Sequence, residues 1–286
     1  MSRGAAYGVV AIAAADLRRA PDHASELRSQ LLLGECVAVL GERARGQWLR
    51  VTGLEDGYSG WMRAWALVRT SALGVRRWQA RARARVVKPL DTLHGEGSPR
   101  SPLMPVFLGS RLAVRSSAGG RSVVELPDGR RGVIATASIS TRALPEISLA
   151  ARLRSLTGVP YLWGGRTPAG FDCSGFTQVV LAEQGLRLPR DARDQYRAAR
   201  RLERGESPRP GDLVFFARGR ESVSHVGIIS GPGTFVHCRG VVREASLNPS
   251  NPLCEKDLVA QLRGFVRPVR GRAYGPIRVL PRAKSP

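Results

Sequence analysis

The chain has 286 residues, 43% of them hydrophobic, and a formal net charge of +22 at pH 7. This length allows two or three small domains, and this hydrophobic content is enough for packed cores. No stretch approaches the roughly 18–20 apolar residues of a membrane span, so we expect no membrane segment. The start of the chain is a poor signal peptide, with one Arg and a Gly-interrupted apolar run. We therefore expect a cytoplasmic protein, with export as the alternative.

The positive charge comes almost entirely from arginine. The lysines are Lys88, Lys256 and Lys284, and the arginines are spread along the chain with modest clusters at 76–85 and 263–284. A basic chain can bind nucleic acid or an anionic surface, but no nucleic-acid motif accompanies this charge. We expect no nucleic-acid partner. We expect the basic charge also to attract wall peptides that are rich in carboxylates.

The first half of the chain alternates short β-type runs with turns, which is typical of small barrels. We expect a first strand at 7–14, and further β-type runs lie at 31–33, 36–40, 48–51 and 60–62. Residues 74–140 look like a second, more divergent copy, with runs at 105–109, 111–114 and 132–134. The expected domains are 1–72, 73–142, 143–270 and a solvated basic tail at 271–286.

A cysteine in the second half has the setting of a nucleophile. Cys173 follows a Gly/Pro-rich turn and precedes an amphipathic run that ends near Gly185. Asp172 is then a natural N-cap, and Cys173 lies in the first helical turn. The unpaired N–H groups and the dipole of a helix start favour a thiolate and can hold an oxyanion. The alternative is a buried structural thiol.

Two histidines downstream can serve that cysteine. His225 starts one short β-type run and His237 lies in the next, with a Gly-Pro-Gly break between the runs. This pattern predicts a hairpin with the two side chains on one face. His225 would accept the thiol proton, and a ring-to-ring hydrogen bond from His237 would orient it. The alternative for each histidine is a satisfied core residue.

The remaining cysteines and histidines suggest no metal site. Cys36 and Cys238 lie in apolar strand patterns, and Cys254 lies in a polar loop. The chain has no CxxC pair and no zinc-ligand spacing, and His23 and His94 lie in loops. We expect neither a metal nor another cofactor, because a thiolate needs none to attack a carbonyl.

Several short motifs in the second half of the chain together resemble those of a known protein family. The segment from about 150 to 270 resembles an NlpC-type cell-wall cysteine peptidase, a papain-like fold. The matching pieces occur in the family's order: Tyr161-Leu-Trp-Gly-Gly165, Asp172-Cys-Ser-Gly175, Leu188-Pro-Arg-Asp191, Gln195, Pro210-Gly-Asp-Leu-Val-Phe-Phe216, His225-Val-Gly227 and His237. The first part resembles a bacterial SH3-like domain. The implied fold class is α+β, a papain-like peptidase domain preceded by two small SH3-like β-barrels.

The resemblance implies a substrate and further site residues. Two such barrels before this peptidase domain resemble a subgroup of the family, the γ-D-glutamyl-L-diamino-acid endopeptidases of murein peptide recycling. In that subgroup the first barrel closes one end of the cleft. Peptides with a free N-terminal L-Ala followed by D-Glu would then fit. The residues expected around the free amine are Tyr161, Asp172 and Ser174, with Glu26 and Tyr58 from the first barrel. Many relatives carry Ser where this chain has Ala192, so one substrate hydrogen bond would be missing or supplied by Asp191.

Three other functions remain open at this point. A secreted or surface endopeptidase could act on intact peptidoglycan, with the barrels as wall-binding modules. A non-catalytic wall-binding protein could keep the scaffold without turnover, although the complete Cys173, His225 and His237 set argues against it. An amidase or acyltransferase could use the same scaffold. The oligomeric state and the preferred diamino acid are left open by the sequence.

Overall fold

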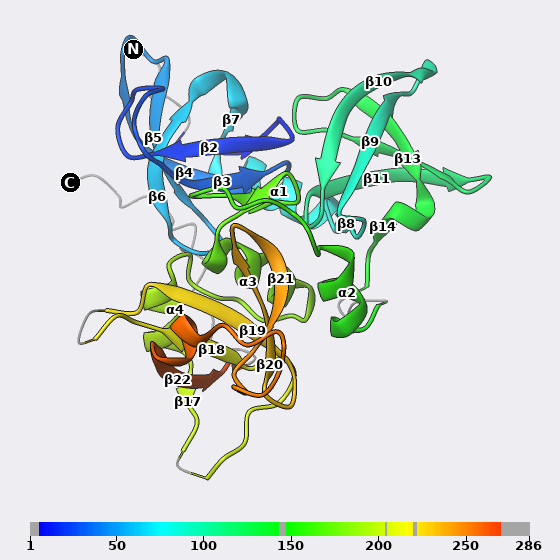
Figure 1. Ribbon diagram of the computed structural model, residues 1–286. Helices are drawn as coiled ribbons and strands as arrows, with labels where there is room; N and C mark the ends of the chain where they lie inside the picture. The colour runs from blue at the N-terminus through cyan, green and yellow to red at the C-terminus, as the bar shows by residue number, and fades with distance from the viewer. Residues whose placement is uncertain (1–5, 143–146, 204, 220–221, 270–286) are drawn as a thin grey trace. The chain divides into compact units, whose positions relative to one another are not determined.

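The computed structural model describes residues 6–142, 147–203, 205–219 and 222–269 (Figure 1). The chain divides into two compact units between residues 142 and 143. The basic tail expected at 271–286 lies outside the described residues. In the described part of the chain, no helix is both long and apolar enough to cross a bilayer.

The first unit begins with a seven-stranded sheet in the order β3-β2-β6-β5-β4-β1-β7. Its strands are β1 (Tyr7–Val10), β2 (Ala14–Arg18), β3 (Leu27–Leu32), β4 (Cys36–Arg43), β5 (Trp48–Gly53), β6 (Ser59–Arg63) and β7 (Leu67–Thr70). The single strand expected at 7–14 was wrong. The chain leaves β1 at Ala11, whose N–H bonds to the carbonyl of Ala66, and β2 then pairs with β3 and β6 instead.

The second sheet repeats the topology of the first. Its strands are β8 (Ala84–Val86), β9 (Leu90–Gly95), β10 (Ser98–Phe107), β11 (Arg111–Ala118), β12 (Arg121–Glu125), β13 (Arg131–Ala135) and β14 (Ile139–Ser140). The order β10-β9-β13-β12-β11-β8-β14 is the first order with seven added to each label. Each sheet encloses its own apolar cluster, around Leu49 and Met62 in the first and around Leu93 and Val124 in the second. A shared topology is what a divergent second copy should show.

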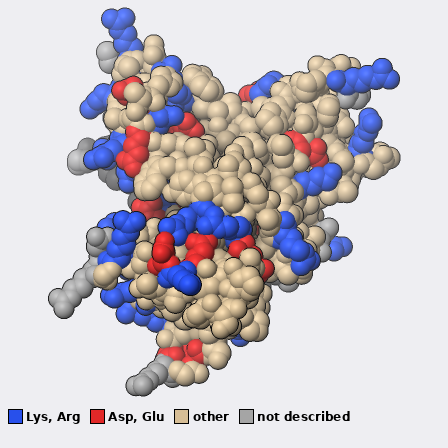
Figure 2. All heavy atoms as spheres, in the orientation of Figure 1, with Lys and Arg blue, Asp and Glu red and all other residues tan. Residues whose placement is uncertain are grey.

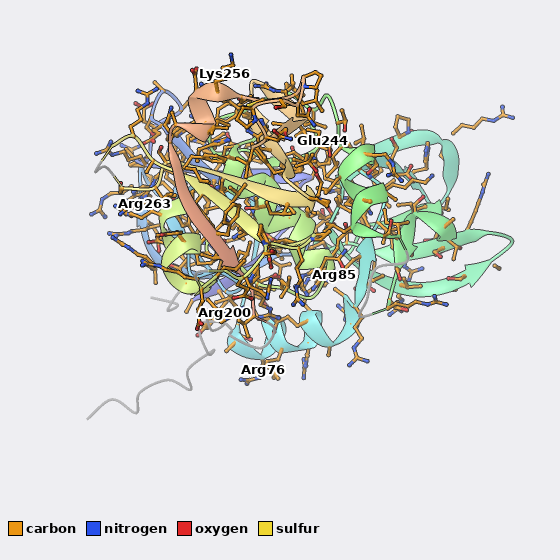
Figure 3. The ribbon with its side chains drawn as sticks, turned by 60° about the horizontal axis from the view of Figure 1, so that its bottom comes forward. Arg76, Arg85, Arg200, Glu244, Lys256 and Arg263 are labelled. Atoms are coloured by element: carbon orange, nitrogen blue, oxygen red, sulfur yellow. The ribbon has the colours of Figure 1, made fainter. Side chains whose placement is uncertain are left out.

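A helix that the sequence analysis missed joins the two sheets. Helix α1 (Ala72–Arg81) starts at Ser71, whose side chain accepts from the N–H of Gly74. Val75 and Trp78 are buried, and the Trp78 indole donates to the carbonyl of Gly34 at 2.9 Å. The expected Arg cluster at 76–85 therefore lies largely on the exposed face of this helix, where Figure 3 labels Arg76.

The second unit is built on a six-stranded antiparallel sheet in the order β17-β22-β18-β19-β20-β21. Its strands are β17 (Arg200–Arg201), β18 (Leu213–Phe216), β19 (His225–Gly231), β20 (Thr234–Arg239), β21 (Val241–Ser246) and β22 (Leu262–Arg267). The other elements are α2 (Leu149–Ser155), β15 (Arg166–Thr167), β16 (Gly170–Phe171), α3 (Cys173–Glu183), α4 (Ala192–Ala198) and α5 (Lys256–Val259). Helix α3 packs against β19 and β20, which brings the cysteine to the histidines (Figure 1).

The arginines do not gather into one stripe on the face shown in Figure 2, where basic and acidic side chains are interspersed. In Figure 3 the labelled basic side chains come from separate elements, including Arg85 on β8, Arg200 on β17 and Arg263 on β22.

Candidate active site

The helix that carries the cysteine is capped as the sequence predicts. Helix α3 runs from Cys173 to Glu183, and Asp172 Oδ1 accepts a hydrogen bond from the Gly175 N–H at 2.6 Å. This carboxylate satisfies one of the N–H groups that a helix start leaves unpaired. The helix ends just before Gly185, which has a φ of +75°. Both predicted helix signals, the Asp cap and the Gly stop, are confirmed.

Glycines allow the start of α3 to be buried against the preceding turn. A Cβ on Gly175 would lie 2.2 Å from the carbonyl oxygen of Gly165, and a Cβ on Gly165 would lie 2.3 Å from that of Gly170. Any side chain at these positions would push the helix away from the turn. The Gly residues of the matching motifs are therefore needed for the close packing that sets the position of Cys173.

A buried arginine fixes the capping carboxylate. Arg190 donates to Asp172 Oδ1 at 3.0 Å and to Oδ2 at 2.6 Å, and Oδ2 also accepts the Gly164 N–H at 2.9 Å. The same guanidinium donates to Ser174 Oγ at 3.0 Å, and Arg190 is 2% exposed. Asp172 and Ser174 therefore already have protein partners. Their expected contact with a substrate amine stays a prediction.

The two histidines lie on the predicted hairpin. Strands β19 and β20 are antiparallel, with Gly227 opposite His237. His225 lies two residues before Gly227, so its side chain shares the face of His237. The Nε2 atom of His225 is 2.8 Å from Nδ1 of His237. A Cβ on Gly227 would lie 3.2 Å from the Cβ of His237, so this glycine leaves room for the buried ring.

A glutamate that the sequence analysis missed continues this row of side chains. Glu255 Oε1 is 3.0 Å from Nε2 of His237. A carboxylate only accepts hydrogen bonds, so His237 carries its proton on Nε2 and leaves Nδ1 as an acceptor. The Nε2 atom of His225 must then donate, which leaves Nδ1 of His225 free of a proton. One hydrogen-bond chain thus sets the tautomer of both rings and makes His225 a base.

Two arginines hold the glutamate. Arg243 donates to Glu255 Oε1 from Nε at 3.0 Å and from Nη2 at 2.7 Å, while Arg239 Nη1 donates to Oε2 at 3.1 Å. Burial opposes ionisation, but the hydrogen bonds and charges of Arg243, His237 and Arg239 hold the pKa of Glu255 below its ordinary value. The β20–β21 register places Arg243 directly opposite His237. The tight turn at Gly240, between β20 and β21, is therefore the sequence feature from which the position of Arg243 beside His237 could have been predicted.

Burial changes the charge state expected for the nucleophile. Cys173 is 7% exposed, and burial together with the Asp172 charge raises its pKa to about 12, against the lowering effect of the Val226 and Ser174 backbone N–H groups. Burial lowers the pKa of His225 to about 3, and the charges of His237 and Arg239 act in the same direction. Burial therefore works against the expected thiolate and favours a neutral thiol and a neutral imidazole in the free protein.

The structure distributes the other predicted residues over both units. Tyr161 shares a pocket with His225, and burial raises its pKa above the ordinary value of a tyrosine. Asp191 precedes α4 without a side-chain cap bond to that helix, and the neighbouring Ala192 is buried. Tyr161 thus lies beside His225, while the roles expected for Tyr161 and Asp191 stay predictions.

The two residues expected from the first barrel lie in the first unit. Glu26 Oε2 is 3.7 Å from Nη1 of Arg19, and the Arg28 guanidinium lies 5.2 Å from the ring centre of Tyr58. Both side chains thus have basic neighbours within their own domain. Their expected contact with the substrate amine stays a prediction.

The four cysteines are free, and among the described residues no group of three or more His, Cys, Asp or Glu side chains could hold a metal ion. Cys238 is fully buried on β20, and its thiol donates to the carbonyl of Phe171 at 3.2 Å. The expectation of a metal-free reaction stays a prediction.

Comparisons with known proteins find matches to both parts of the chain. Residues 158–263 match the NlpC/P60 family, and residues 17–67 match the bacterial dipeptidyl-peptidase SH3 domain. A crystal structure of an NlpC/P60 family protein from Bacillus cereus ATCC 10987 superposes with a TM-score of 0.79 at 24% identity, over 91% of this chain and 99% of the other. That similarity shows that the two chains share a fold.

Two curated relatives extend the similarity along most of the chain. The γ-D-glutamyl-L-lysine dipeptidyl-peptidase of Bacillus cereus ATCC 10987 is 29% identical over 247 residues, 80% of this chain and 72% of that protein. The protein of the same name from Bacillus subtilis 168 is 29% identical over 251 residues, 84% of this chain and 81% of that protein. The chain is therefore a cysteine peptidase that combines an NlpC/P60 domain with an N-terminal bacterial dipeptidyl-peptidase SH3 domain.

Proposed function

We propose that this peptidase hydrolyses the γ-D-glutamyl–L-diamino-acid bond of short murein peptides that carry a free N-terminal L-Ala. The hydrogen-bond chain from His225 through His237 to Glu255 is the observation that carries the catalytic part of this proposal. The names of the two curated relatives support the choice of the γ-D-glutamyl bond. The match to the bacterial dipeptidyl-peptidase SH3 domain supports a preference for peptides that carry a free N-terminus two residues before the cleaved bond.

The proposed reaction starts from the neutral pair. Nδ1 of His225 takes the thiol proton of Cys173 as the sulfur attacks the γ-carbonyl carbon of D-Glu. The backbone N–H of Cys173, at the start of α3, donates to the developing oxyanion. His225 then returns its proton to the leaving amine of the diamino acid, and the acyl group stays on sulfur as a thioester. Water, deprotonated by His225, cleaves the thioester and regenerates the thiol.

His237 and Glu255 act on this cycle without contacting the substrate. His237 is fully buried, so its task is to keep Nε2 of His225 in a hydrogen bond while the ring gains and loses a proton. Glu255 holds His237 in the tautomer that this requires. A histidine in this place does what an Asn or Asp side chain does in related catalytic sets.

The free-amine preference is the part of the proposal that rests on resemblance. Tyr161, Asp172 and Ser174 would surround the amine from the peptidase domain, and Glu26 and Tyr58 would do so from the first SH3-like domain. A free ammonium group needs carboxylate and hydroxyl oxygens around it, and these residues supply both. Asp191 would supply the substrate hydrogen bond that Ala192 cannot make.

Mass-spectrometric product analysis tests the proposal. One substrate is L-Ala-γ-D-Glu-diaminopimelate with a free amine, and the other is the same peptide with an acetylated N-terminus. Release of L-Ala-D-Glu from the free peptide alone is the expected result. Equal cleavage of both peptides would contradict the free-amine requirement and favour an endopeptidase of intact wall. Cleavage of neither peptide would contradict the proposed bond specificity.

We also propose that the enzyme works in the cytoplasm, where peptides released from the wall are recycled. Four free cysteines suit a reducing compartment. Fractionation of the native host, with antibody detection of the protein, tests this point. Recovery of the protein from the wall or the medium would contradict it.

A further inference from the structure

A basic pocket opens beside the catalytic histidine. It has a volume of about 430 Å³, and all of its lining residues belong to the second unit. His225 and Tyr161 form part of its wall, together with Arg218 and Arg239. None of its lining residues is acidic, so a ligand in the pocket meets positive charge next to the group that moves the proton.

The two guanidinium groups reach the pocket from separate segments. Arg239 is the last residue of β20, and Arg218 lies in the loop that follows β18. Both side chains are exposed, and that of Arg239 is 45% exposed. Two cations that line one pocket repel each other, and an anion bound in the pocket relieves that repulsion.

Arg239 is held in place before any ligand arrives. Its Nη1 donates to Glu255 Oε2 at 3.1 Å, and its backbone carbonyl accepts from Arg243 Nη1. Arg239 and Arg243 carry two positive charges and Glu255 carries one negative charge, so the cluster of these three residues has a net charge of +1. A guanidinium fixed by a carboxylate on one edge loses little further freedom when its other edge binds an anion.

We propose that this pocket binds a carboxylate of the substrate residue adjacent to the scissile bond, through Arg218 and Arg239. The inference rests on the proposed function and adds to it a subsite for a carboxylate. The pocket shares His225 with the reacting centre, so the carboxylate must belong to a residue joined by that bond. In the proposed substrate it is either the α-carboxylate of D-Glu or the distal carboxylate of a diaminopimelate leaving group.

Such a carboxylate would also assist the chemistry. The charges of Arg239 and Arg243 help to keep the pKa of His225 low in the free protein. A bound carboxylate offsets these charges and favours the protonated His225 that forms when the thiol is deprotonated. Substrate binding would thus raise the basicity of His225 when the reaction needs it, and the free enzyme would keep a neutral, unreactive thiol.

Four peptides separate the two sources of the carboxylate. All have a free N-terminal L-Ala, with either D-Glu or its α-amide at the second position and either diaminopimelate or L-Lys at the third. The specificity constant kcat/KM is measured for each peptide with the wild-type protein and Arg218→Gln. Arg154→Gln is the matched control, because Arg154 is exposed on α2 and does not line the pocket.

We expect Arg218→Gln to lower kcat/KM about tenfold, the effect of one partly solvated charge-assisted hydrogen bond, only for peptides with the recognised carboxylate. Selective loss with the two D-Glu peptides assigns the α-carboxylate, and selective loss with the two diaminopimelate peptides assigns the distal one. Equal kcat/KM values for wild type and Arg218→Gln on all four peptides, or equal losses on all four, would overturn the inference. If the wild-type protein cleaves none of them, the proposed function itself fails and the inference falls with it.

Discussion

Replacement of Glu255 by glutamine should slow the chemical step more than it weakens substrate binding. The carboxylate accepts a hydrogen bond from Nε2 of His237 at 3.0 Å, and this bond sets the tautomers of both histidines. A glutamine oxygen can still accept from His237 Nε2 and from Arg243, so the tautomers are kept, but the amide carries no negative charge. The positive charge that His225 gains when it takes the thiol proton then lacks its negative counterpart at the end of the hydrogen-bond chain, so the proton transfer becomes less favourable.

The structure gives the size of this effect. A hydrogen bond to a charged group contributes about 1.5–3 kcal/mol. The Glu255 side chain is 18% exposed and shares its charge with Arg239 and Arg243, so we take about 2 kcal/mol from the lower part of that range. At about 1.4 kcal/mol for each tenfold in rate, kcat should fall about 30-fold. KM should change less than kcat, because His237 is fully buried and touches no substrate, and Glu255 reaches the proposed carboxylate subsite only through Arg239.

Steady-state kinetics on L-Ala-γ-D-Glu-diaminopimelate measures both constants. Glu244→Gln is the matched control: Glu244, labelled in Figure 3, lies on β21. It accepts a hydrogen bond from Ser230 Oγ at 2.8 Å. The control should keep wild-type kcat and KM. A folded Glu255→Gln protein with wild-type kcat, or one whose loss lies entirely in KM, would refute the assigned role of Glu255.

Three further predictions concern the buried charges. Burial lowers the pKa of His237 to about 4, so below about pH 6.5 the unfolded chain binds a proton at this residue that the folded chain does not bind. In urea unfolding, this residue should make the protein about 2 kcal/mol less stable at pH 5 than at pH 7. The variant His237→Asn should lack this part of the stability loss. Alkylation of Cys173 by iodoacetamide, followed by peptide mapping, should be slow at pH 7 and accelerate with rising pH, because burial raises its pKa to about 12; fast alkylation at pH 7 would contradict a neutral thiol. Arg190→Met should cost about 3–5 kcal/mol in urea unfolding, because it leaves the Asp172 carboxylate buried without its cation, and a loss no larger than that of Arg154→Gln would contradict this role.

Local patterns were sufficient to predict the elements that carry the nucleophile and the base. The Asp172 cap is read from residues within one helical turn, and the hairpin of His225 and His237 follows from a Gly-Pro-Gly break between two β-type runs. Both signals act over a few residues, where sequence and conformation are directly linked. Helix α1 was missed because buried Val75 and Trp78 give it only a narrow apolar face.

Residues brought together by tertiary contacts could not be predicted in the same way. Glu255 lies 18 residues after His237, beyond β21 and a loop, and no periodic pattern links the two positions. The charge state of Cys173 also depends on tertiary structure: the helix start favours a thiolate, but the surrounding protein removes water and reverses the balance. Sequence therefore indicated which side chains react, while packing determines how their protons are arranged.

The measurement that tests the central claim most directly compares the wild-type protein with Cys173→Ala on L-Ala-γ-D-Glu-diaminopimelate, with products identified by mass spectrometry and folding checked by thermal unfolding. The account predicts that the wild-type protein releases L-Ala-D-Glu and that a folded Cys173→Ala protein releases none. Release of the same product by Cys173→Ala at the wild-type rate would contradict catalysis by this thiol.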